Sequence, residues 1–148
     1  MYDDVTTRTM AARPTIVVPA TTTWRQFPTL WRELLDEVWA CLRAADVHHA
    51  RNVMLYLDDV PHVEVGVESN AAFPLTGRVV ASALPGGPVA MTTHRGSYAS
   101  LGAAHQAVKD WCVVNGRPRA GPWWEVYGPH RDAPSEVWVE VYYLLAED

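Results

Sequence analysis

The chain has 148 residues, of which 49% are hydrophobic and 20% charged, and its 12 Lys and Arg against 17 Asp and Glu give a formal net charge of -5. A chain of this length buries enough surface to fold without disulfides or a structural metal, so collagen, coiled coil and a disordered chain are excluded. The acidic balance argues against nucleic acid and anionic membranes, because phosphate groups attract a basic face. We therefore expect one soluble globular domain over residues 1–148, with neither nucleic acid nor membrane as a partner.

The two cysteines and the N-terminal segment also indicate a cellular compartment. Cys41 and Cys112 lie among apolar residues, as free thiols of a cytoplasmic protein do. The N-terminus has neither the basic nor the apolar stretch of a signal peptide, and no run approaches the ~18 apolar residues of a membrane span. We predict a cytoplasmic protein.

The first half predicts strands, a helix and a hairpin. Residues 5–18 are rich in Thr and Val and predict one or two short strands. From about residue 28 to residue 45 the apolar residues recur at helical spacing, and Pro28 fits the first turn of that helix. Residues 52–57 and 60–68 predict a hairpin around two aspartates.

The second half predicts the same order of elements. Residues 78–84 and 89–94 are strand-like and flank a turn of Pro and Gly. Ser97 is a good N-cap for a second helix, which Gly116 ends. A further pair of strands is predicted over residues 123–127 and 137–145.

Short segments of the two halves match each other. Met54 to Leu57 corresponds to Glu125 to Gly128 at a separation of 71 residues, and Val63 to Val65 corresponds to Val139 to Val141 at a separation of 76. Such a period indicates a duplicated unit rather than a solenoid. We predict an α+β fold of two βαββ pseudo-repeats, at about residues 5–70 and 76–146. They would form an antiparallel sheet with two long helices on one face and a central ligand cleft.

Several segments resemble one known family, the GyrI-like small-molecule-binding domains of the SOUL/GyrI type. These segments are Leu84-Pro85-Gly86-Gly87-Pro88-Val89-Ala90, His94-Arg95-Gly96-Ser97-Tyr98, Leu101-Gly102, Trp111, Gly121-Pro122-Trp123-Trp124-Glu125-Val126-Tyr127 and Glu140-Val141. The family includes the effector-binding domains of bacterial AraC-type and MerR-type multidrug-responsive regulators. The resemblance covers nearly the whole chain and implies a cleft for flat, apolar, often cationic molecules, without a cofactor. Because no helix-turn-helix precedes Thr15, we expect a stand-alone member rather than direct control of transcription.

The resemblance implies that a buried Glu among aromatic rings reads the cation, and the motif places that role on Glu125. Period two puts Trp123 and Tyr127 on the same strand face as Glu125. A carboxylate between rings attracts an organic cation both by charge and by cation–π contact. The alternative is an ordinary strand Glu beside core aromatics.

Five further residues are predicted to bind ligand. Tyr56 and Met54 are the repeat counterparts of Tyr127 and Glu125, so one half would read charge while the other supplies soft apolar surface. His105, on the apolar stripe of the second helix, is interpreted as a hydrogen-bonded core or cleft histidine rather than a metal ligand. Tyr98 and Trp138 complete the predicted site.

The spacing of the histidines matches no metal site, so we expect no metal. Two functions remain open. The first is a non-catalytic protein that senses or sequesters multiple drugs. The alternative is a hydrolase of electrophilic, cyclopropane-type xenobiotics, with Glu125 as general acid or base and Tyr127 as its partner. A homodimer or a protein partner is also open.

Overall fold

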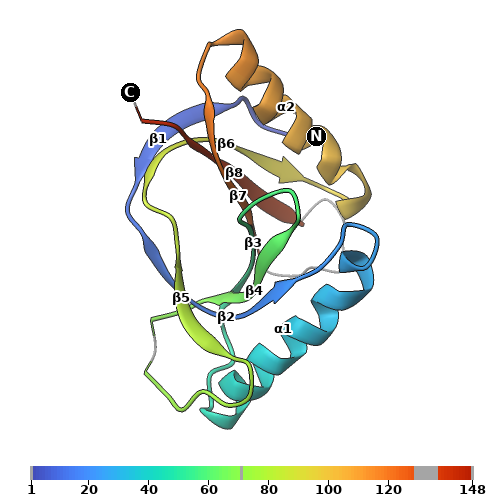
Figure 1. Ribbon diagram of the computed structural model, residues 1–148, viewed down its shortest axis with the longest axis vertical. Coiled ribbons are helices and arrows are strands. Elements are labelled where there is room, and N and C mark those ends of the chain that lie inside the picture. The colour runs from blue at the N-terminus through green and yellow to red at the C-terminus, as the bar shows by residue number, and fades with distance from the viewer. Residues whose placement is uncertain (1, 71, 129–136, 148) are drawn as a thin grey trace. The chain divides into compact units, whose positions relative to one another are not determined.

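The computed structural model describes residues 2–70, 72–128 and 137–147, and its elements fall into two compact units (Figure 1). The N-terminal unit comprises Ala12–Leu84, and the C-terminal unit comprises Met1–Ala11 with Pro85–Asp148. Within both units each strand pairs antiparallel with its neighbours. The predicted α+β class is therefore confirmed.

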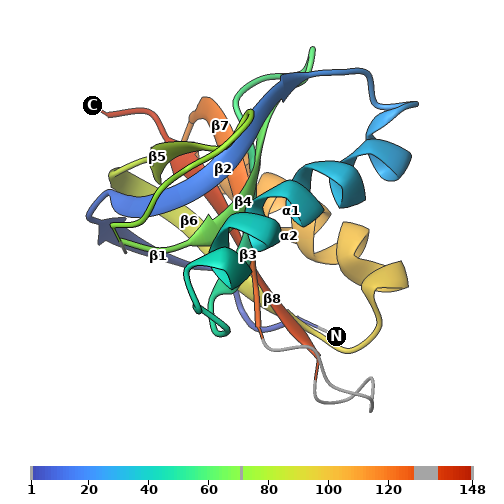
Figure 2. The ribbon, with the colours of Figure 1, turned by 90° about the horizontal axis from the view of Figure 1, so that it is seen from below.

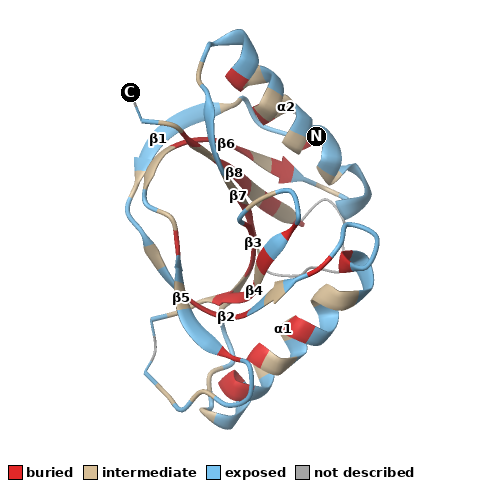
Figure 3. Cartoon of the chain, viewed as in Figure 1, coloured by how far each residue is buried: buried red, intermediate tan, exposed pale blue. Residues whose placement is uncertain are grey.

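The N-terminal unit places one helix on four strands in the order β3-β4-β2-β5. Its elements are β2 (Arg13–Thr21), α1 (Phe27–Ala44), β3 (Arg51–Tyr56), β4 (His62–Glu68) and β5 (Val80–Leu84). The helix α1 packs against β2 and β4, as Figures 1 and 2 show. Pro28 lies in its first turn, as predicted. Buried residues recur along one side of α1, where they form the core with the strands (Figure 3).

The C-terminal unit has the same plan, with strand order β1-β6-β8-β7. Its elements are β1 (Thr6–Met10), β6 (Gly87–Arg95), the 3-10 turn η1 (Tyr98–Ser100), α2 (Leu101–Val114), β7 (Arg119–Tyr127) and β8 (Trp138–Leu145). The helix α2 packs against β6 and β8. The hydroxyl of Ser97 accepts from the amide of Ala99, so the predicted cap closes a 3-10 turn that leads into α2. Gly116, at φ 62°, ends the helix.

The duplication is confirmed in strand register. Met54 pairs with Val65 as Glu125 pairs with Val141, which reproduces the separations of 71 and 76 residues read from the sequence. The helices repeat at a separation of 70 residues, because the burial pattern of residues 31–44 matches that of residues 101–114 at all but one position. Equivalent residues of the two units can therefore be compared one by one.

The edge strands β1 and β5 do not pair with the strand that follows each of them in the chain. β1 precedes β2 but pairs with β6, whereas β5 precedes β6 but pairs with β2. The units consequently divide at residues 11–12 and 84–85, and not between the two predicted pseudo-repeats.

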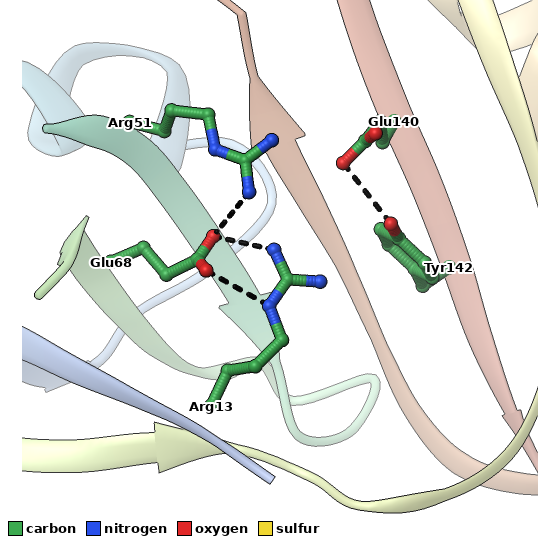
Figure 4. Close-up of polar contacts among 5 residues, drawn as sticks. All are labelled: Arg13, Arg51, Glu68, Glu140 and Tyr142. Carbon is green, nitrogen blue, oxygen red and sulfur yellow. Dashed lines mark hydrogen bonds and ion pairs between the residues drawn. The ribbon is translucent and has the colours of Figure 1, made fainter. Parts of the chain in front are cut away.

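A carboxylate at the end of β4 connects three strands of the N-terminal unit (Figure 4). Glu68 accepts from Arg13 Nε at 2.9 Å and from Arg51 Nη2 at 3.1 Å. Burial would raise the pKa of Glu68, but the hydrogen bonds and charges of the two arginines outweigh it and hold that pKa below its usual range. A lowered pKa stabilises the folded state above the pKa of the unfolded chain, and this gain is lost as pH falls through the folded pKa.

We predict that Glu68→Gln lowers the free energy of unfolding by about 1 kcal/mol at pH 7. The difference should shrink as pH falls below about 4.3, the usual pKa of Glu, because the unfolded wild type then takes up a proton that folded Glu68, with its lowered pKa, still resists. Urea unfolding of both proteins at pH 7 and pH 3 measures this. The same difference at both pH values would contradict the ion-pair account.

Candidate functional site

A carboxylate lies inside the core of the C-terminal unit. Glu125 of β7 is only 5% exposed, and its strand neighbours Trp123 and Tyr127 pack against the buried cluster that α2 forms with β8. Alternation along β7 puts Glu125 on this same helix-covered face. A buried charge is costly unless it is hydrogen-bonded, so its partners define the site.

Four side chains form a continuous hydrogen-bonded group, here called the polar quartet: Glu125, His105, Tyr127 and Tyr143. The Tyr127 hydroxyl donates to Glu125 Oε1 at 2.7 Å. His105 Nε2 lies 2.6 Å from Glu125 Oε2, and His105 Nδ1 lies 2.7 Å from the Tyr143 hydroxyl. The quartet thus links α2 to both β7 and β8.

The chemistry of these groups assigns the protons. An ionised carboxylate only accepts, so His105 Nε2 carries the hydrogen that points at Glu125. His105 Nδ1 then accepts from the Tyr143 hydroxyl, which fixes the tautomer of the imidazole. With His105 neutral, the quartet carries one negative charge, located on Glu125.

Aromatic rings border the quartet and differ in exposure. Tyr98, at 44% exposed, meets the Tyr127 ring edge-on at 5.8 Å between centroids, and burial of its remaining part raises the pKa of Tyr98. Tyr143 is 2% exposed, stacks with Trp123 at 5.9 Å and lies under the guanidinium of Arg119. Tyr98 is thus exposed, Trp123 and Tyr127 are half-buried, and the buried Tyr143 positions His105 from within.

The N-terminal unit shows what the fold requires at these places. The residues there equivalent to His105, Glu125, Tyr127 and Tyr143 are Leu35, Met54, Tyr56 and Val67. The same helix-on-sheet arrangement is thus built with apolar side chains at three of the four positions. Since apolar replacement of a buried ionic group is often neutral for stability, the architecture does not need the quartet. Its presence in one unit points to binding or chemistry.

A family model described as a GyrI-like small molecule binding domain matches residues 3–145. The chain belongs to the GyrI-like family. The expectation drawn from the sequence motifs is thereby confirmed. No curated protein matches this GyrI-like chain.

Solved structures share the fold of this GyrI-like chain at low sequence identity. The C-terminal domain of EcmrR is 15% identical with a TM-score of 0.78, over 100% of this chain and 99% of that one. SAV2435, solved bound to tetraphenylphosphonium, is 10% identical with a TM-score of 0.68, over 97% and 94%. A hydrolase from Listeria innocua is 8% identical with a TM-score of 0.61, over 97% and 92%. At these identities the likeness shows the fold alone.

The remaining predicted site residues lie elsewhere in the GyrI-like fold. Met54 and Tyr56 are buried on β3, where the Tyr56 hydroxyl lies 3.8 Å from the Met54 sulfur and the Tyr56 ring contacts Trp24 and Phe27. These side chains are apolar or aromatic. The N-terminal unit therefore differs chemically from the quartet, as the sequence indicated.

Trp138 is not brought together with Glu125. It lies on β8 in alternation with the buried valines, so it shares the opposite face with Glu140 and Tyr142. On that face Glu140 accepts from the Tyr142 hydroxyl at 3.0 Å (Figure 4). Glu140 is half-buried there, so it offers a comparison carboxylate outside the quartet.

Sequence reasoning missed Tyr143. The available signal was its position two and four residues after Val141 and Val139, which puts a polar hydroxyl on a face otherwise made of valine and leucine. In the described part of this GyrI-like chain, no three His, Cys, Asp or Glu side chains gather as metal ligands do. Nor does that part contain a helix long and apolar enough to cross a membrane.

The comparison of the two units predicts an unusual order of stabilities. His105→Leu alone removes one partner of a buried carboxylate and should lower the free energy of unfolding by about 3 kcal/mol. The triple variant His105→Leu, Glu125→Met, Tyr143→Phe removes the charge as well and should fall within about 2 kcal/mol of the wild type. Urea unfolding ranks the three proteins. A triple variant less stable than the single one would show that the fold does depend on the quartet.

Proposed function

We propose that this chain binds flat, apolar, often cationic aromatic compounds, as a sensing or sequestering protein in the cytoplasm. The observation that carries the proposal is the buried carboxylate of Glu125, which accepts hydrogen bonds from His105 and Tyr127 beside the rings of Tyr98 and Tyr127. The family to which the chain belongs supports binding of a small molecule. The tetraphenylphosphonium bound to SAV2435, a protein of the same fold, supports a cation.

The forces available at this site suit an organic cation. A positive charge about 5 Å from the carboxylate gains about 3 kcal/mol at the effective dielectric constant of a partly buried site. Each ring whose face meets the cation adds about 0.5–2 kcal/mol. Because Glu125 is already ordered by Tyr127 and His105, little side-chain entropy is lost when a ligand binds.

Met54 and Tyr56 of the N-terminal unit are included as apolar ligand-binding residues, and Trp123 of the C-terminal unit is included as a ring that contacts the ligand. Trp138 is dropped from the proposal, since that residue shares a face with Glu140. The net charge of -5 supports a cation rather than a nucleic acid as the partner.

A hydrolase is the second candidate, and one observation favours it. Glu125 lies in hydrogen-bond reach of two groups that can exchange protons, the Tyr127 hydroxyl and the His105 imidazole. A cyclopropane-type electrophile bound against Tyr98 would then find an acid and a base at one place.

One experiment tests both candidates. The protein is mixed with tetraphenylphosphonium, and separately with an aromatic compound that carries a strained cyclopropane, while calorimetry records binding and mass spectrometry records products. Binding without product supports the binding protein, and product that disappears in Glu125→Gln but not in Glu140→Gln supports the hydrolase. If neither compound binds and no product forms, both candidates fail.

A further inference from the structure

Within the quartet the His105 imidazole and the Tyr127 hydroxyl both contact the carboxylate of Glu125, and of the two only the imidazole becomes a cation when it takes up a proton. We propose that His105 determines which ligand charge the site prefers. Neutral His105 leaves the negative charge of Glu125 available to a cation. Protonated His105 cancels that charge, so that the site then favours neutral aromatic compounds. This inference rests on the proposed function and deepens it, because it makes His105 a specificity-determining residue that acts through Glu125.

The geometry accommodates both protonation states without moving heavy atoms. His105 Nε2 donates to Glu125 in either state. His105 Nδ1 accepts from the Tyr143 hydroxyl when neutral and must donate when protonated. A tyrosine hydroxyl can do either by rotating its hydrogen, so the 2.7 Å contact is kept. Both charged groups are largely shielded, with side chains 16% and 6% exposed, so solvent screens their interaction only weakly.

Other titratable groups lie on α2 and on the elements near it. On α2 itself Lys109 lies one turn further on, and on β7 the guanidinium of Arg119 lies over the Tyr143 ring. Tyr98 of η1 contacts Tyr127. From β6, the buried His94 hydrogen-bonds through Nε2 to the carbonyl of Ser97. Among the described residues, the carboxylate that contacts His105 is that of Glu125.

The charge of the quartet therefore changes from -1 to 0 when His105 takes up a proton. A cation at Glu125 and a proton on His105 compete for one negative charge, and the competition is reciprocal by thermodynamic linkage. While His105 is protonated, each further fall of one pH unit should weaken cation binding by up to about tenfold, because one proton is exchanged.

The test uses two flat probes of the same shape, the permanent cation 1-methylquinolinium and the neutral 1-methylnaphthalene. Their dissociation constants are measured by quenching of tryptophan fluorescence from pH 5 to pH 8.5. For the wild type we expect the constant for the cation to fall at least tenfold over this range and that for the neutral probe to change less than threefold. Calorimetry of the cation in buffers of different ionisation enthalpy should show release of close to one proton at the acidic end.

Two variants separate His105 from other histidines. His105→Gln keeps a donor toward Glu125 but cannot change its charge, so its affinity for the cation should be nearly independent of pH. The matched control is His62→Gln, because His62 also contacts a carboxylate at 2.6 Å, that of Asp58, but at the exposed first residue of β4 in the other unit. This control should keep the wild-type pH profile.

A measurement on the wild type guards against a misfolded variant. The imidazole resonances of His105 are followed by NMR against pH, with and without each probe. The cation, and not the neutral probe, should make His105 take up its proton at lower pH. A cation affinity independent of pH in the wild type, an unchanged slope in His105→Gln or an unmoved titration of His105 each overturns the inference while the proposed function stands. If neither probe binds at any pH, the proposed function fails and the inference falls with it.

Discussion

Glu125→Gln is expected to weaken binding of 1-methylquinolinium by ten- to a hundredfold at pH 8, and binding of 1-methylnaphthalene by less than threefold. The factor corresponds to about 1.4–2.8 kcal/mol, a part of the Coulomb energy that a carboxylate offers a cation about 5 Å away. The shape of the site is unchanged because Gln and Glu are nearly isosteric. The substitution should therefore change the affinity for the cation and for the neutral probe differently only because of charge.

The quartet can accommodate the amide. The oxygen of Gln at position 125 can accept from Tyr127, and its NH2 group can donate to His105 Nε2 if the imidazole carries its hydrogen on Nδ1. The Tyr143 hydroxyl would then accept that hydrogen, so every member keeps a partner. We expect the free energy of unfolding to change by only about 1 kcal/mol, which fluorescence-monitored urea unfolding verifies.

The control for this prediction is Glu140→Gln. Glu140 and Glu125 each accept from a tyrosine two residues later on their strand, at 3.0 Å and 2.7 Å. Glu140 faces away from the helix-covered core, so the substitution of an amide for its carboxylate should leave the affinity for both probes as in the wild type. Equal losses in the two variants would mean that the net charge of the protein, and not Glu125, attracts the cation.

Gly66→Ala is expected to lower the free energy of unfolding by about 3 kcal/mol or more. A Cβ on Gly66 would overlap the carbonyl oxygen of Ile16 and lie 2.7 Å from Val17 Cα on the neighbouring strand β2. These are backbone atoms in a paired strand, so they cannot turn aside as a side chain does. The two central strands of the N-terminal unit would have to separate.

Gly102→Ala is the matched control for that change. Gly102 lies in α2, and a Cβ there meets nothing within 4 Å, so alanine should stabilise the helix by about 0.5–1 kcal/mol. Thermal and urea unfolding of both variants measure the two effects. If Gly66→Ala is as stable as the wild type, β2 and β4 do not approach as closely as described.

Much of the fold was predictable because it is encoded locally. Helical spacing of apolar residues, with Pro28 in the first turn, located α1 to within a residue at each end. The duplicated segments predicted the strand register, since Met54 and Glu125 occupy the same place opposite Val65 and Val141. The pairing of β1 with β6 was not predictable, because it joins Thr6 to Met91 across most of the chain. Nothing local distinguishes it from a hairpin of β1 with β2.

The candidate site was predictable along a strand and less so across elements. Alternation placed Tyr127 beside Glu125, and their hydrogen bond agrees with it. The link from His105 to Glu125 depends on how α2 lies on the sheet, which helical periodicity does not determine. Tyr143 was missed for the same reason, since its role comes from its contact with His105. Trp138 was chosen for its residue type, whereas its strand face separates it from Glu125.

The most direct measurement of the central claim is NMR of the wild type, with labelled Glu and Tyr side chains, titrated with 1-methylquinolinium. If Glu125 reads the charge of the ligand, the largest changes will appear at the Glu125 carboxyl carbon and at the rings of Tyr98 and Tyr127, with little change at Glu140. If the probe binds while the Glu125 carboxyl carbon stays unmoved, the account of the site is wrong.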